Sequence, residues 1–357
     1  MSIASPRRPP SQAYLSFAAL AACLAFITPG SAVAETPPGL QAITSEPEFL
    51  PAQRNWERLG IRDAELRLLE RFHRGEGHEG WNIAYKSLEL NMTGVLTHPY
   101  VPVPQTPEEQ MKFPLVVLSH GSDFGVDARY RAIALDLARR GYVVLAPTFR
   151  GRVGPEGRSE GVVQIGRNEV IDLLQLAQLG RKLEYVDSLR IAVIGEGHGA
   201  TAALLAIERS NVFRAAVVIS PLIFSGLAEY GFAGINRLVD LQDALFGRKL
   251  DRYDLVRELN ARDMFRGAGR IRTPMLFIHT EMDPSYVDQR RFLGELAANN
   301  IRPRVLEFPG MWPYFMTSHN DGARPLNWLQ ERDRAWDEVF AFIEERIPPP
   351  PEEEVDP

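Results

Sequence analysis

The sequence predicts an α/β protein with a mostly parallel central sheet that is covered by helices on both faces. Short, almost continuously apolar runs such as residues 115–118 and 191–194 are typical of strands buried on both faces. Longer segments with apolar residues at helical spacing alternate with these runs along the second half of the chain. Regular strand–helix alternation is typical of parallel sheets, because a crossover helix returns the chain to the edge where each strand starts.

The individual elements follow in a regular order. A short helix is expected first, with Asp63 near its start and Leu66, Leu69 and Phe72 on one face, and two β-rich runs follow between residues 81 and 100, with a turn near Asn91. The remaining strands are expected at residues 115–118, 142–146, 191–194, 215–219, 275–278 and 305–308, and helices are expected around Ile133, at 170–179 and 200–207, and after each of the last two strands.

The chain divides by composition into several segments. The segment 221–272 is about 50 residues long, with apolar residues at helical spacing and no clear strand. It is expected to form a helical lid insertion over the edge of the sheet, and the alternative is a helical excursion on the surface. The expected boundaries are a signal peptide at 1–34, an N-terminal extension at 35–80, an α/β domain at 81–347 and a disordered tail at 348–357.

The first residues have the pattern of a secretory signal. Arg7 and Arg8 precede the uncharged apolar run 13–27, and small residues lead to a cleavage point after Ala34. The run is shorter than the roughly 20 residues that span a bilayer, so no stable membrane span is expected after cleavage. Lipidation at Cys23 is the second alternative. The sequence therefore predicts an exported protein, periplasmic or extracellular.

Composition narrows the classes of partner and cofactor. Cys23 is the only cysteine, so a mature chain would hold no disulfide and no thiolate metal site. The formal net charge is −6 and no basic stripe interleaved with aromatics occurs, so no nucleic-acid partner is expected. No metal and no cofactor are expected.

The segment from residue 195 to 199, Gly-Glu-Gly-His-Gly, has two interpretations. As a nucleophile elbow, G-x-S-x-G, it would place the attacking residue at Gly197, which has no side chain. As a dinucleotide fingerprint, Gly195, Gly197 and Ala200 fit G-x-G-x-x-A after a strand. That fingerprint needs an acid about 20 residues later, and the next strand ends in Ser220 and Pro221 without a carboxylate.

The surrounding sequence resembles the prolyl oligopeptidase and dienelactone hydrolase families of α/β-hydrolases. The resemblance runs from about residue 113 to 343. It is carried by the strand ending in His120 and Gly121, which is similar to the oxyanion-loop HG motif, by residues 138–147 and by Tyr185-Val186-Asp187 before the elbow strand. Residues 274–279, which lead to Asp283, are similar to the strand that delivers the triad acid. The resemblance implies an α/β-hydrolase fold with esterase or peptidase chemistry.

Mapped onto this family, the catalytic triad is incomplete. Asp283 matches the triad acid, but Gly197 stands at the nucleophile position and Pro313 stands where the family has its histidine. The oxyanion donors would be backbone N–H groups near Ser122 and at His198. Because neither Gly197 nor Pro313 can take part in proton transfer or attack, we expect a pseudoenzyme that binds a small molecule or a protein partner.

Two further functions stay open from the sequence. An active serine-type hydrolase would need non-standard residues, and His319 is the candidate substitute base. A dinucleotide-binding protein is the third hypothesis. Trp312, Tyr314 and Phe315, together with Phe224 of the insertion, are expected either to line an apolar pocket or to belong to the ordinary core.

Overall fold

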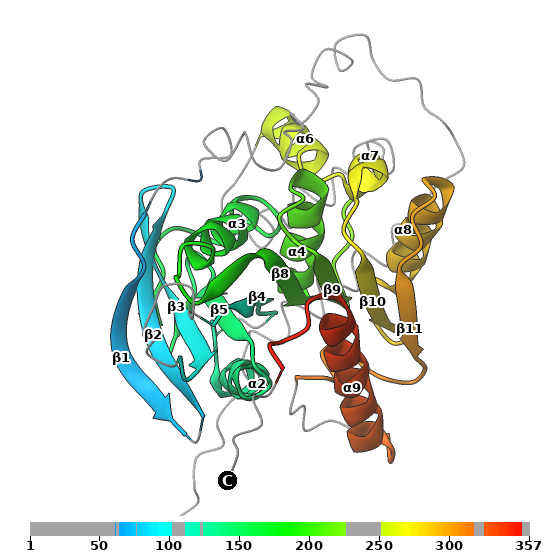
Figure 1. The fold of residues 1–357 in the computed structure, drawn as a ribbon. Coiled ribbons are helices and arrows are strands. Elements are labelled where there is room, and N and C mark those ends of the chain that lie inside the picture. Colours follow the sequence, from blue (N-terminus) through cyan, green and yellow to red (C-terminus); the bar gives the residue numbers. More distant parts are fainter. Residues whose placement is uncertain are drawn as a thin grey trace, which may run out of the picture.

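A nine-stranded sheet runs through the computed structural model, which describes residues 61, 64–75, 77–101, 111–121, 124–225, 251–317 and 325–351 (Figure 1). The strand order is β1-β2-β3-β5-β4-β8-β9-β10-β11. The last six positions in this order form a parallel block, as the sequence predicts. Its strands are β5 (Val143–Thr148), β4 (Phe113–Ser119), β8 (Val186–Glu196), β9 (Ala215–Ile219), β10 (Met275–Thr280) and β11 (Arg304–Phe308).

Three antiparallel strands extend the sheet on the side of β5. They are β1 (Arg67–Arg74), β2 (His78–Ser87) and β3 (Leu90–Pro99), and β3 pairs antiparallel with β5. The expected short helix after Asp63 is therefore wrong, because this segment pairs with β2 as an edge strand. Leu69 and its neighbour Leu68 are exposed there, so the helical spacing of three apolar residues does not describe a buried face.

Helices cover both faces of the sheet, as predicted. On one face lie α2 (Ala128–Arg139) and α9 (Trp328–Arg346); on the other lie α3 (Asn168–Gly180), α4 (His198–Arg209) and α8 (Tyr286–Ala298) (Figure 1). Each face has its own apolar core. Alternate residues of the central strands point into the two cores, as Val117 and Leu118 of β4 do.

The insertion after β9 is described only in part. Residues 251–270 form α6 (Arg252–Asn260), α7 (Met264–Gly267) and a single 3₁₀ turn, Ala268–Arg270, whereas residues 226–250 lie outside the described residues. The helical content of 251–270 agrees with the sequence, and the lid itself stays a prediction. The signal peptide 1–34, nearly all of the extension up to residue 63 and the tail beyond residue 351 also lie outside the described residues.

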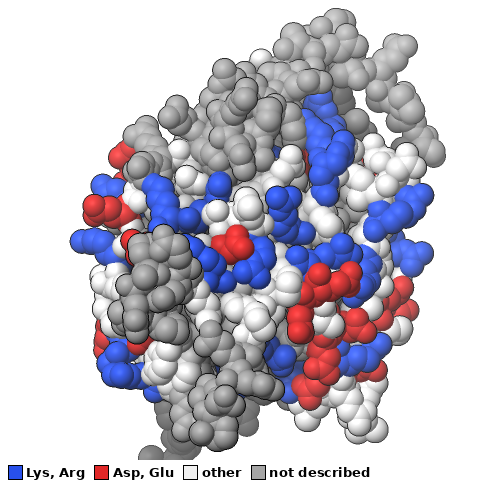
Figure 2. All heavy atoms as spheres, viewed as in Figure 1, with Lys and Arg blue, Asp and Glu red and all other residues white. Residues whose placement is uncertain are grey.

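Two further observations concern the surface and the helices. Within the part of the chain that the structure describes, no helix has the length and apolar character needed to cross a membrane. Figure 2 shows that Lys and Arg side chains mix with acidic side chains on the face that is turned to the viewer, where acidic residues gather over α9.

A small two-stranded sheet, β6 (Val153–Gly154) and β7 (Gly157–Arg158), completes the fold.

Candidate functional site

The turn between β8 and α4 has the geometry of a nucleophile elbow. Gly197 alone separates the two elements and adopts φ +53° and ψ −117°, a conformation that residues with side chains rarely adopt. A Cβ on Gly195 would lie 2.5 Å from the carbonyl oxygen of Gly199, and a Cβ on Gly199 would lie 2.2 Å from the carbonyl oxygen of Ser119. The flanking glycines are therefore required for β8, α4 and β4 to pack this closely.

The side chain of Tyr314 covers the elbow. A Cβ built on Gly197 would lie 2.3 Å from Cε1 and 2.5 Å from Oη of this tyrosine, and a Cβ on Gly121 would lie 3.0 Å from the same Cε1. The phenol ring thus lies between Gly121, in the loop after β4, and the elbow glycine Gly197. It occupies the space that the side chain of a nucleophile would need.

Asp283 lies in the loop after β10 and is buried. Its carboxylate accepts hydrogen bonds from the backbone N–H of Ser285 and from Nε2 of Gln289, both at 2.8 Å. The Ser220 hydroxyl lies close enough to lower the pKa of Asp283, although the two groups form no hydrogen bond of standard geometry. Burial outweighs these donors and raises the pKa of Asp283 from 3.8 to about 6. The hydrogen-bond donors that contact Asp283 are therefore neutral groups.

The loops that carry these residues leave the same edge of the sheet. In the parallel register Glu196 pairs with Ile219, and Thr280 at the end of β10 pairs with Phe308. The carboxyl ends of β8 to β11 consequently lie side by side, with strands about 4.8 Å apart. The segment that holds Pro313 reaches the elbow through the adjacent Tyr314. Asp283 lies at this edge too, and its carboxylate binds donors from α8 and its own loop.

The predicted oxyanion donors are described in part. His198 is the first residue of α4, so its backbone N–H lies at the positive end of a 12-residue helix. Its imidazole is buried and stacks on Phe149 with centroids 5.0 Å apart. Burial lowers the pKa of His198 to about 3, so the ring is neutral at physiological pH. Ser122 and the candidate base His319 lie outside the described residues.

Sequence reasoning missed the role of Glu196. Its buried carboxylate Oε2 accepts hydrogen bonds from the hydroxyl of Tyr130 at 2.6 Å and from the hydroxyl of Thr317. Tyr130 in turn accepts the backbone N–H of Gly121 at 2.8 Å. Burial raises the pKa of Glu196 to about 7. One buried acid therefore connects the loop after β4, the elbow and the segment after β11. The only feature of the sequence that points to this role is the position of Glu196 directly before the elbow.

The aromatic residues named from the sequence do not line one pocket. Phe315 belongs to the core that α2 and α9 cover, and Phe224 belongs to the core on the opposite face of the sheet. Trp312 is half exposed. The core alternative is thus correct for both phenylalanines.

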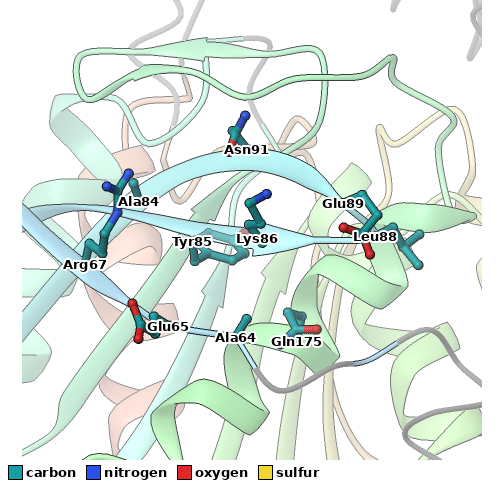
Figure 3. A pocket seen from close by; sticks show the side chains of 10 residues that line it. All are labelled: Ala64, Glu65, Arg67, Ala84, Tyr85, Lys86, Leu88, Glu89, Asn91 and Gln175. Carbon is teal, nitrogen blue, oxygen red and sulfur yellow. The ribbon is translucent and has the colours of Figure 1, made fainter.

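A cavity of about 620 Å³ lies away from the elbow, in the antiparallel extension (Figure 3). It lies where β1, β2 and the β2–β3 turn approach α3, and its polar side chains carry both charge signs. Its lining consists of Ala64, Glu65, Arg67, Ala84, Tyr85, Lys86, Leu88, Glu89, Asn91 and Gln175. Among the described residues, no group of three or more metal-ligating side chains gathers anywhere.

The comparisons with known proteins agree with this geometry. The sequence profile of the prolyl oligopeptidase family matches residues 129–310, about half of the chain and including the elbow. The chain belongs to the prolyl oligopeptidase family. Comparison with curated protein sequences gives no match.

Solved structures with the same fold include esterases and peptidases. Acetyl xylan esterase 1 from Thermoanaerobacterium sp. JW/SL YS485 has a TM-score of 0.55 at 19% identity, over 86% of this chain and 98% of that one. The Pyrococcus horikoshii acylaminoacyl peptidase has a TM-score of 0.57 at 20% identity, over 77% of this chain and 43% of that one. A dienelactone hydrolase described as putative, from Klebsiella pneumoniae, has a TM-score of 0.51 at 15% identity, over 80% and 100% of the two chains. At these identities the likeness establishes the α/β-hydrolase fold.

Proposed function

We propose that this member of the prolyl oligopeptidase family is a pseudoenzyme that binds a small molecule or a protein partner at the carboxyl edge of its sheet. The observation that carries the proposal is the contact between Tyr314 and Gly197. The elbow has no nucleophilic atom, and an aromatic ring fills the space above it. Both features oppose attack on a substrate carbonyl by the usual route, which needs a hydroxyl at the elbow and a histidine within hydrogen-bond reach.

The surroundings of Asp283 support the same proposal. In a working triad the acid orients a histidine and stabilises its charged form. Here the carboxylate is held by Ser285 and Gln289 instead, and the sequence comparison with the family predicts Pro313 at the position of its histidine. What survives is the helix N-terminus at His198, which still attracts an anion or a carbonyl oxygen. Such a site supports binding without turnover.

The proposal is tested by assaying the purified protein on p-nitrophenyl acetate and on aminoacyl p-nitroanilides. We expect rates indistinguishable from those of the Asp283→Asn variant, because no step depends on that acid. Turnover that the substitution abolishes would refute the proposal and would show that the triad acid still serves catalysis.

One observation favours the second candidate, a serine hydrolase with non-standard residues. Ser220 directly follows β9 and adopts φ +47°, a strained conformation for a residue with a side chain, and its hydroxyl is buried beside Asp283. Strained residues gather at functional sites. If the protein hydrolyses esters, Ser220→Ala should remove the activity, whereas Ser119→Ala, which removes another buried hydroxyl, should retain it.

Export belongs to the proposal as well. The pattern around Arg7, Arg8 and Ala34 supports cleavage after Ala34, which gives a periplasmic or extracellular protein. Intact mass of the protein recovered outside the cytoplasm tests this. A mature chain that begins at Glu35 is expected, and a lipid-modified chain that begins at Cys23 would replace simple cleavage with lipidation.

A further inference from the structure

The segment from Met311 to Thr317 is held by hydrogen bonds from neighbouring helices to three consecutive backbone carbonyls. The carbonyl oxygen of Phe315 accepts a hydrogen bond from Nε1 of Trp328 at 3.0 Å, and that of Met316 accepts one from Nε1 of Trp336 at 3.2 Å. The carbonyl oxygen of Thr317 accepts one from Nη1 of Arg129 at 2.9 Å. The segment is thus held by α2 and α9, and the Met311, Phe315 and Met316 side chains are buried in the core beneath it.

Tyr314 is the residue of this segment that faces the elbow. It adopts φ +65°, which costs a residue with a side chain about 1 kcal/mol or more. The strained backbone places the phenol between Gly121 and Gly197, while the neighbouring side chains enter the core. The strain is maintained because the contacts on both sides of Tyr314 fix the backbone.

Glu196 ties this segment to the elbow itself. Its Oε2 accepts the hydroxyl of Thr317, three residues after Tyr314, and also the hydroxyl of Tyr130, which holds Gly121. Both glycines that contact the phenol ring are therefore connected to one carboxylate, since Glu196 immediately precedes Gly197 in the chain. Within the described residues the other oxygen of Glu196, Oε1, has no hydrogen-bond partner. When Glu196 is ionised, above its pKa of about 7, two charge-assisted bonds converge on a single buried oxygen.

We propose that residues 311–317 are an autoinhibitory plug, in which Tyr314 occupies the ligand position at the elbow and Glu196 latches the plug through Thr317. This proposal rests on the proposed binding function, and we also assign the class of ligand. The slot between Gly121 and Gly197 takes a flat aromatic ring whose hydroxyl points to the start of α4, and such a ligand binds in exchange for Tyr314.

Amide hydrogen exchange tests the latch. Exchange is measured by mass spectrometry in peptides that cover residues 311–317, where Phe315 and Thr317 donate backbone hydrogen bonds within the turn. Thr317→Val removes the latch hydroxyl at nearly constant volume, and exchange in the plug should rise about tenfold or more, the value of one charge-assisted hydrogen bond. Glu196→Gln should act in the same direction, and Thr317→Ser should restore slow exchange.

The chain offers a matched control for this substitution. Thr280 is buried at the same edge of the sheet, and its hydroxyl has no hydrogen-bond partner among the described residues. Thr280→Val should leave exchange in the plug unchanged. Peptides of β5, which holds none of the substituted residues, serve as an internal reference for global unfolding. The latch is refuted if Thr317→Val and Glu196→Gln both leave exchange in residues 311–317 within twofold of the parent protein, or if Thr280→Val raises it equally.

The ligand class is tested with 4-methylphenol, the tyrosine side chain as a free molecule. Tyr314→Ala empties the slot, and millimolar 4-methylphenol should raise its melting temperature, whereas toluene, which lacks the hydroxyl, should raise it less. The parent protein should show a smaller shift with 4-methylphenol, because the ligand must first displace Tyr314. An equal shift with toluene, or an equal shift in the parent protein, would overturn the assignment. Neither outcome depends on ester hydrolysis, so the plug and the pseudoenzyme proposal fail separately.

Discussion

Adding a single methyl group at Gly197 tests whether Tyr314 really fills the elbow. Gly197→Ala places a Cβ 2.3 Å from Cε1 of Tyr314, closer than such contacts occur, at a φ of +53°. The backbone strain costs about 1–3 kcal/mol, and overpacking costs about a further 1–3 kcal/mol. We therefore expect urea denaturation to show a loss of about 2–6 kcal/mol in the free energy of unfolding.

The two contributions can be separated with the chain's own controls. Gly310 has φ +70° and open space where its Cβ would lie, so Gly310→Ala carries a conformational cost without a clash. In a Tyr314→Ala background the clash disappears, and Gly197→Ala should cost about 1–3 kcal/mol less than in the parent protein. If the two substitutions are additive to within about 0.5 kcal/mol, the phenol does not lie over the elbow and the account is wrong.

Three other predictions follow from the site. Burial raises the pKa of Asp283 from 3.8 to about 6, so ionisation of this acid destabilises the fold as the pH rises through this window. In urea titrations between pH 4 and 7.5, the free energy of unfolding of Asp283→Asn should therefore rise by about 2–3 kcal/mol relative to that of the parent protein. A difference that stays constant with pH would contradict this. The double variant Gly197→Ser, Pro313→His should not hydrolyse aryl esters, because the ring of Tyr314 still blocks the site. Adding Tyr314→Ala should give turnover, because triad members act as a unit. A folded triple variant without turnover would place the loops outside the roughly 3 Å reach of proton transfer. NAD and FAD should produce no shift in melting temperature, and a clear shift would restore the dinucleotide hypothesis.

The alternation of strands and helices could be predicted because it depends on local patterns. Strands buried on both faces are apolar throughout, and the helices between them carry regular apolar stripes, so β4, β8 and α3 are where the sequence places them. The sequence predicts a helix where the edge strand β1 lies, because Leu66, Leu69 and Phe72 are spaced by three. An edge strand is half solvated, and its pairing partner decides its conformation.

The site could be predicted only as far as backbone motifs determine it. Three glycines around residue 197 predict a sharp strand-to-helix turn, and the order of segments predicts which loops meet at that edge. The direction of a loop side chain has no such signal. Tyr314 turns onto the elbow because its φ is positive and its neighbours are anchored by Trp328 and Trp336, contacts that link distant parts of the chain. The buried bonds of Glu196 are equally nonlocal.

The most direct test of the central claim is the intact mass of the protein after incubation with a fluorophosphonate, which labels activated serine nucleophiles. We predict an unmodified mass, because Gly197 has no nucleophilic atom and Tyr314 covers the elbow. Stoichiometric addition of one phosphonyl group to a single serine, lost on heat denaturation before labelling, would contradict it and establish the protein as a working serine hydrolase.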